Sequence, residues 1–256
     1  MVMPYKTQVV FTFLADFPAI PYLIFALRKC LKSGDPAPLL MFIGGFFASS
    51  FEAIVDVAGG CFFPREGQII GYEWFGRPVP VFVPLNYGWF VGGMGYWALT
   101  LLRNPTTTRR DLWTLWAKFI VINLILEYPP LYFGIYTYYG NQPFQVLGFP
   151  LWFPCLNAIS PIVAATITHL ISPHLTGWTR YVMVTTTASS YGLSHAAFGF
   201  PLWIALSTGK GLAVTYPAGV ITFVLLATGV WIMSLSLPEK RSVRLESSAR
   251  VAGTKG

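Results

Sequence analysis

The sequence predicts an all-α, polytopic membrane protein, with about seven transmembrane helices in a bundle and an outward-facing, lidded pocket. Hydrophobic residues make up 54% of the 256-residue chain and charged residues only 11%, whereas a soluble domain has about 25% charged residues. The apolar residues form long continuous runs, which are typical of membrane helices and differ from the alternating pattern of a membrane β-barrel. Four carboxylates interrupt these runs, and they indicate a polar site within the membrane.

Seven stretches are long and apolar enough to span a bilayer: 8–27, 38–60, 81–102, 112–135, 150–172, 181–205 and 213–237. The first is the least apolar, because Asp16, Pro18 and Pro21 interrupt it. It is predicted to be a helix rather than a signal peptide, since only Lys6 precedes it and no A-x-A-like cleavage site follows. A single domain is expected over residues 1–237, and the polar, basic segment 238–256 is expected to be a disordered cytoplasmic tail.

The basic residues predict the orientation. With seven spans, thirteen of the 17 lysines and arginines fall on the side of the C-terminal tail, and four fall on the other side: Lys6, Arg65, Arg77 and Lys210. Cytoplasmic loops carry an excess of Lys and Arg, so we expect the N-terminus outside and the C-terminus in the cytoplasm. The net charge of +7 then reflects topology and contact with anionic lipid, and it predicts no nucleic-acid partner.

The four intramembrane carboxylates are Asp16, Glu52, Asp56 and Glu127. A charge near the middle of a bilayer costs at least ~2.5–3.5 kcal/mol, so such groups face a polar cavity, pair with a partner or do chemistry. Nearly all intramembrane polar residues fall in the outer half of the predicted spans, which indicates one cavity closed on the inner side. The residues predicted to bind substrate there are Asp16, Asn86, Tyr87, Asn123, Trp152, Asn157, His195 and Tyr216.

Two long outer loops, 61–80 and 136–149, are expected to roof this cavity as lids, because loops of this length often bind or cover a site. The first loop is rich in aromatic residues. Their exposure to water would be costly, so we expect them to pack onto the helix ends: Phe62, Phe63, Trp74 and Phe75.

Three carboxylates are predicted to be catalytic: Glu52, Asp56 and Glu127. Glu52 and Asp56 are spaced i, i+4, as are Asn123 and Glu127, so each pair shares one helix face. Two carboxyl groups close together in a low dielectric do not both ionise easily, and one retains a proton. That proton suits a general acid and the neighbouring group suits a base. The motif EYPP, from Glu127 to Pro130, interrupts the helix ladder and fits a cavity wall.

Structural roles remain open for several of these groups. Glu52 and Asp56 could form ion pairs with Arg65 or Arg77 of the first outer loop. Asp16 could cap or brace the kinked first helix.

No metal or cofactor is predicted. The three cysteines have no C-x-x-C spacing and the three histidines are scattered, so neither a zinc site nor a haem site is indicated. His195 is interpreted either as a binding residue or as a hydrogen-bonded core histidine. Gly88 and Gly92 form a G-x-x-x-G spacing, which is more typical of helix packing than of catalysis.

Four runs carry a family resemblance: FEAIVDVAGGCFFPREGQ at 51–68, FGRPVPVFVPLNYGWFVGG at 75–93, EYPPLYFGIYTYYGNQPF at 127–144 and FPLWFPCLNAISP at 149–161. They are similar to the avermectin-type spirocyclase family, a group of actinobacterial integral membrane proteins associated with polyketide tailoring. The resemblance covers roughly residues 40–205. It implies a bacterial plasma-membrane protein and spiroketal formation with loss of water, without a redox cofactor. No catalytic residue is taken from the resemblance.

The function predicted is a membrane-embedded, cofactor-independent cyclase or dehydratase that acts on a lipophilic, polyketide-like substrate by carboxylate acid–base catalysis, as in spiroketal ring closure. Aromatic side chains would shelter a cationic intermediate. One alternative is an integral membrane terpene cyclase that starts cyclisation by protonation. The other is a non-catalytic protein that binds or transports a lipid or small molecule, for which a polar inner gate would be expected. The expected partners are a lipophilic small molecule and the bilayer, and the oligomeric state stays open.

Overall fold

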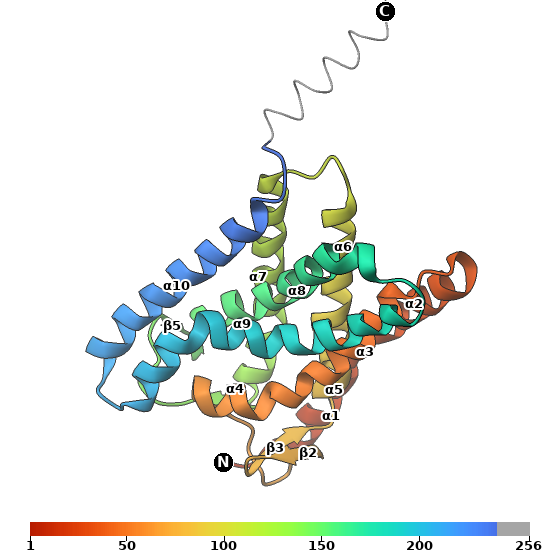
Figure 1. The fold of residues 1–256 in the computed structure, drawn as a ribbon. Helices are drawn as coiled ribbons and strands as arrows, with labels where there is room; N and C mark the ends of the chain where they lie inside the picture. Colours follow the sequence, from red (N-terminus) through yellow and green to blue (C-terminus); the bar gives the residue numbers. More distant parts are fainter. Residues whose placement is uncertain (240–256) are drawn as a thin grey trace, which may run out of the picture.

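The computed structural model describes residues 1–239 and is mostly helical (Figure 1). The predicted tail at 238–256 lies outside the described residues from position 240 onward. The α-helices are α1 (Tyr5–Asp16), α2 (Ala19–Ser33), α3 (Ala37–Ala48), α4 (Glu52–Gly59), α5 (Val83–Tyr87), α6 (Met94–Arg103), α7 (Arg109–Tyr132), α8 (Trp152–Ile171), α9 (Val182–Ser207) and α10 (Leu212–Ser234). Short helical segments are η1 (Ser49–Phe51), the π-helical η2 (Gly88–Gly93), η3 (Ser172–His174) and η4 (Gly177–Tyr181).

Four helical segments within residues 1–239 are long and apolar enough to cross a membrane: Tyr5–Ser33, Ala37–Gly59, Trp152–His174 and Leu212–Ser234. The prediction of a mostly helical protein is confirmed, and these four segments could span a membrane by their length and composition. The remaining predicted spans, 81–102, 112–135 and 181–205, also fall on helical segments, namely α5 through α6, α7 and α9. These three are not among the four segments that are long and apolar enough to cross a membrane.

The helical segment that corresponds to the first predicted span, 8–27, is longer than predicted and is interrupted. It comprises α1 and α2, which cover residues 5–33 with a break at Phe17 and Pro18. The break follows from Pro18 and Pro21, which have no backbone N–H for the helix ladder. Only 17% of the most apolar window of this segment is buried inside the protein, compared with 61% for Trp152–His174. The α1–α2 segment is therefore a peripheral element.

The core forms around α8, which packs against α6, α7, α9 and α10. A second close contact joins α3 to η2, and glycines make it possible. A Cβ at Gly92 would lie 2.2 Å from the Met41 carbonyl oxygen, and one at Gly88 would lie 2.7 Å from the Phe42 ring. The helix-packing role that the G-x-x-x-G spacing predicts is therefore confirmed.

The helices do not all run side by side. In Figure 1, α6 and α7 run up the view, whereas α3 and α9 run across it. The N-terminus lies at the bottom of this view and the blue C-terminal end of the described chain lies at the top, so these two ends are at opposite ends of the molecule.

Within residues 1–239, three short two-stranded antiparallel sheets occur that were not predicted from the sequence. They are β1 (Cys61–Phe62) with β4 (Thr137–Tyr138), β2 (Ile70–Trp74) with β3 (Arg77–Pro80), and β5 (Gln145–Val146) with β6 (Phe149–Pro150). The first of these joins the two long outer loops to each other, because Cys61 pairs with Tyr138. Both loops thus meet at the end of α4.

The packing predicted for the first outer loop is wrong in part. Phe63 is buried, with 8% of its surface exposed, but Trp74 and Phe75 are 52% and 77% exposed. The physical reason is the β2–β3 hairpin: Phe75 lies at its tip, with a positive φ of 53°, and the tip projects away from the helix ends. Only the base of this loop covers the helices.

Candidate functional site

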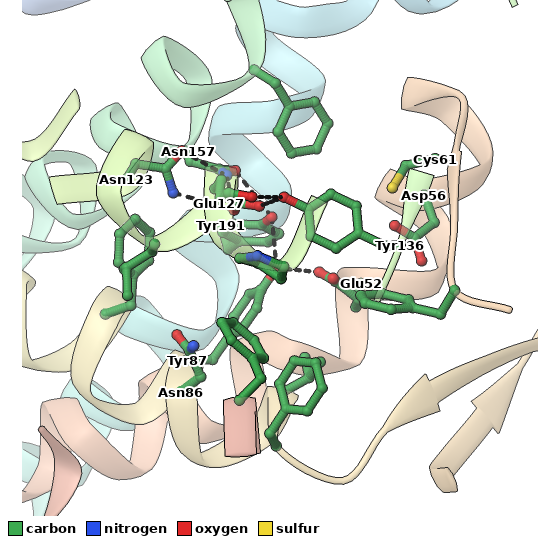
Figure 2. Close-up of a pocket in the computed structure, with 18 of the residues that line it drawn as sticks. Glu52, Asp56, Cys61, Asn86, Tyr87, Asn123, Glu127, Tyr136, Asn157 and Tyr191 are labelled. Carbon is green, nitrogen blue, oxygen red and sulfur yellow. Dashed lines mark hydrogen bonds between the residues drawn. The ribbon is translucent and has the colours of Figure 1, made fainter. Parts of the chain in front are cut away.

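A cavity with about 80 Å³ of free volume lies where α4, α5, α7, α8 and α9 meet the bases of the two outer loops (Figure 2). Seven of the eleven residues predicted as site residues line it: Glu52, Asp56, Asn86, Tyr87, Asn123, Glu127 and Asn157. The three predicted catalytic carboxylates therefore share one cavity. The other lining residues are Phe11, Cys61, Phe63, Phe82, Val83, Phe90, Leu126, Pro130, Tyr136, Tyr138, Phe153 and Tyr191.

Four predicted binding residues do not line the cavity. Asp16 ends α1, and its Oδ1 atom is buried without a hydrogen-bond partner among the described residues. Trp152 is fully buried and donates its indole N–H to Gln142 Oε1 at 3.2 Å. Tyr216 is exposed and packs its ring on Phe144 at 4.8 Å. His195 is fully buried behind the cavity wall and hydrogen-bonded, as the core-histidine interpretation predicts.

Glu52 is held by a chain of hydrogen bonds. The Tyr87 hydroxyl donates to Glu52 Oε2 and also lies 2.7 Å from the Tyr191 hydroxyl. The Tyr191 hydroxyl is 3.2 Å from the side-chain amide of Asn157. His195 Nε2 contacts the same end of that amide at 3.1 Å. The chain therefore leads from Glu52 on α4 to the amide on α8.

Glu127 lies at the other end of this chain (Figure 2). Its Oε1 atom is 3.3 Å from the Asn123 amide and 3.5 Å from the Asn157 amide. The Tyr136 hydroxyl donates to Glu127 Oε2 and lies 2.9 Å from the Glu127 carbonyl oxygen. Burial raises the pKa of Tyr136 well above its ordinary range, and the nearby Glu127 charge adds to this. Tyr136 therefore keeps its proton at neutral pH and acts as a neutral hydrogen-bond donor.

Asp56 differs from the other two carboxylates. Its Oδ2 atom is buried and has no hydrogen-bond partner within the described residues. The Cys61 thiol lies beside its carboxyl group (Figure 2). Burial, and then the charge of Asp56, raise the pKa of the Cys61 thiol well above its ordinary range. The thiol is thus neutral at neutral pH.

No ion pair involving these three carboxylates occurs among residues 1–239. Arg65 pairs with Glu73 instead, at 2.8 Å, and Arg77 donates to the Tyr139 hydroxyl at 3.1 Å. The interpretation of Glu52 and Asp56 as partners in structural ion pairs is therefore wrong for direct contacts.

The sequence did not single out four polar or ionisable residues that line the cavity: Cys61, Tyr136, Tyr138 and Tyr191. Cys61 lies on β1, Tyr138 lies on β4 and Tyr136 lies just before β4. The pairing of these two distant strands had no sequence signal. Tyr191 is one of 13 tyrosines, and its spacing alone does not separate it from those of a membrane interface. Its place four residues before His195 on α9 was the only signal available.

Within residues 1–239, no group of three or more His, Cys, Asp or Glu side chains is arranged to hold a metal ion. Comparison of the chain with protein-family models, with curated proteins and with solved structures finds no match.

Proposed function

We propose that this protein is a membrane-embedded cyclase or dehydratase that closes a ring in a lipophilic, polyketide-like substrate by acid–base catalysis. The observation that carries the proposal is the set of three carboxylates that line one cavity and have no direct cationic partner among residues 1–239. Ring closure with loss of water needs a proton for the departing oxygen and a base for the attacking hydroxyl. A buried carboxyl group that keeps its proton supplies the first, and an ionised one supplies the second.

The rest of the cavity wall supports a cationic intermediate. Its apolar part consists mainly of aromatic rings, from Phe11, Phe63, Phe82, Phe90 and Phe153. Such rings attract positive charge at their faces. Water would capture an oxocarbenium ion, and a dry aromatic wall protects it.

The size of the cavity bears on how a substrate fits. A typical small-molecule site has ≈ 300–1,000 Å³, whereas this cavity has about 80 Å³. A second, apolar cleft of about 300 Å³ between α1 and α7 shares Phe11 and Pro130 with the cavity. The reacting oxygens would occupy the cavity while the hydrocarbon part of the substrate lies in the cleft. The peripheral packing of α1 makes its movement the simplest way to join the two.

The proposed arrangement in the membrane has seven spans, an outward-facing pocket and a cytoplasmic C-terminus. An odd number of crossings is supported by the N-terminus and the blue C-terminal end of the described chain, which lie at opposite ends of the molecule (Figure 1). Arg109 pairs with Glu239 at the C-terminal end, where basic residues favour the cytoplasm. The bases of the outer loops, joined through β1 and β4, would act as the lid.

The avermectin-type spirocyclase resemblance is part of this proposal. The four runs that carry it contain nine of the eleven polar or ionisable residues lining the cavity, all but Asn123 and Tyr191. Spiroketal closure is therefore the favoured reaction. A terpene cyclase started by protonation would use the same acid and the same aromatic wall, so the products must separate the two.

The test uses purified protein in lipid nanodiscs with two kinds of substrate, a lipophilic dihydroxyketone and a linear polyprene. Spiroketal closure lowers the mass by one water, whereas terpene cyclisation gives an isomer of unchanged mass. The proposal expects the first product with wild-type protein and its loss in Glu52→Gln, Asp56→Asn and Glu127→Gln. The matched control is Glu73→Gln, which changes a carboxylate outside the cavity. Equal turnover in all five proteins would reject acid–base catalysis in this cavity.

A further inference from the structure

We infer that His195 is a positioning residue which fixes the Asn157 amide so that Glu127 carries the proton and acts as the acid. The inference rests on the proposed function and deepens it, because it assigns the acid among three carboxylates. It follows from which groups along the chain from His195 to Glu52 can donate a hydrogen bond and which can only accept one.

The contacts of the His195 imidazole determine its tautomer. Its Nδ1 atom lies 2.9 Å from the Tyr191 carbonyl oxygen. Because a carbonyl oxygen only accepts, Nδ1 carries a hydrogen. The side chain is fully buried and no carboxylate contacts it among the described residues. A second proton would leave an unpaired cation in an apolar core, which is very unfavourable. The imidazole is therefore neutral, and Nε2 is a lone pair that needs a donor.

That donor is the Asn157 amide. The Asn157 atom that lies 3.1 Å from His195 Nε2 is placed as Oδ1. With an oxygen there, two hydrogen-bond acceptors, Oδ1 and Nε2, would face each other without a hydrogen between them. A half-turn of the amide brings its NH₂ group to this position without changing its shape. The second hydrogen of that group then points to the Tyr191 hydroxyl at 3.2 Å.

The hydroxyls of Tyr191 and Tyr87 then donate their hydrogen bonds in one direction, toward Glu52. Because Tyr191 accepts from Asn157, its own hydrogen goes to the Tyr87 hydroxyl, 2.7 Å away. Tyr87 then donates to Glu52. Glu52 is the accepting end of the chain, which suits it to take a proton from an attacking hydroxyl.

The other end of the turned amide determines the state of Glu127. Its oxygen now lies 3.4 Å from Asn123 Oδ1 and 3.5 Å from Glu127 Oε1. If Asn123 keeps its orientation, a hydroxyl on Glu127 is the donor left for this oxygen. If Asn123 turns as well, its own oxygen faces Glu127 Oε1 at 3.3 Å and again needs that hydroxyl. In both cases Glu127 holds a proton on Oε1 while Tyr136 donates to Oε2.

The reaction balances with these roles. The carbon–oxygen bond to the departing hydroxyl breaks as Glu127 gives that oxygen its proton, and water leaves. The bond from the attacking oxygen forms as its proton passes to Glu52. One proton then returns from Glu52 to Glu127 before the next turnover.

Infrared spectroscopy tests the inference without a substrate, because a protonated carboxyl group has a C=O stretching band that a carboxylate lacks. The difference between wild-type protein and Glu127→Gln at neutral pH should contain this band, and the difference between wild-type protein and Glu52→Gln should lack it. A band that disappears only in Glu52→Gln, or no band in either difference, would overturn the assignment. If turnover still falls in the glutamine variants in that case, the proposed function stands and only this inference fails.

The role of His195 needs its own variants. In His195→Leu, the Asn157 amide is free to turn its NH₂ group toward Glu127. The pH at which half of the Glu127 band is lost should then fall by about one unit, a tenfold change in proton affinity. His195→Gln retains an acceptor and should restore the wild-type value, and His169→Leu, outside the cavity, is the matched control. An unchanged band in a folded His195→Leu protein would show that His195 has no positioning role.

Discussion

The carboxylates of this protein occupy two contrasting environments. On the surface, Glu73, Asp35 and Glu239 each face a cation, at 2.8 Å from Arg65, 3.6 Å from Lys29 and 2.7 Å from Arg109. In the cavity, the carboxylates contact phenols, amides and a thiol, and no ion pair reaches them among residues 1–239. The same functional group is therefore stabilised by a cation in one region and by neutral hydrogen-bond donors in the other.

This difference has a chemical meaning. A direct ion pair favours the ionised form of a carboxyl group and so prevents it from holding a proton at neutral pH. Burial among neutral donors leaves both protonation states accessible, which a catalyst that gives and takes protons requires. Asp56 shows the cost most clearly, because its Oδ2 atom is left without a partner within the described residues, and an unsatisfied buried acceptor costs ≈ 1–3 kcal/mol.

The largest effect should come from exchanging carboxylates for amides in both environments. Glu52→Gln, Asp56→Asn and Glu127→Gln keep size and shape but remove the titrating proton, so turnover should fall about 10²–10⁴-fold. Glu73→Gln and Asp35→Asn should leave turnover unchanged. Steady-state assays with thermal melting as a folding control compare the two sets, and similar losses in both sets would remove the distinction between the environments.

A smaller effect is expected from removing the phenol hydroxyls that donate hydrogen bonds to the cavity carboxylates. Tyr87→Phe and Tyr136→Phe each remove a donor to Glu52 or Glu127. A hydrogen bond to a charged group contributes ≈ 1.5–3 kcal/mol, which corresponds to a loss of turnover of about 10–100-fold. Tyr139→Phe is the control, since Tyr139 contacts Arg77 outside the cavity. Wild-type turnover in both cavity variants would mean that the phenols do not tune the acids.

The smallest effect should be seen at the surface pair. The Arg65 hydrogen bonds lower the pKa of Glu73 from its ordinary value of 4.5. A lowered pKa adds stability that is present above the unfolded-state value and is lost as the pH falls through the folded-state value. Arg65→Ala should therefore melt slightly below wild-type protein at neutral pH, and the two curves should converge in acid. Divergence toward low pH would contradict this sign.

The sequence predicted the polar core of the site through helix periodicity. The i, i+4 spacings of Glu52 with Asp56 and of Asn123 with Glu127 place both pairs on faces that meet at the cavity. Helix limits were also close, as in Ala37–Gly59 against the predicted 38–60. Local spacing was sufficient because each of these features lies within one helix.

Features that depend on contacts between distant segments were not predictable. The pairing of β1 with β4 brings Cys61 beside Tyr138, and no spacing in the sequence encodes that register. Asp16 and Tyr216 were placed in the site because of their depth in a predicted span, but depth does not define which way a side chain faces. The break at Pro18 and the outward position of the α1–α2 segment separate Asp16 from the cavity.

The central claim is that the cavity carboxylates form one acidic site open to lipophilic molecules. Reaction with a lipophilic carbodiimide, which modifies protonated carboxyl groups, tests it directly when the labelled peptides are identified by mass spectrometry. The account predicts modification of Glu127, while a water-soluble carbodiimide modifies Glu73 and Asp35 first. Modification of Glu73 and Asp35 by the lipophilic reagent, with all three cavity carboxylates intact in the folded protein, would contradict the account.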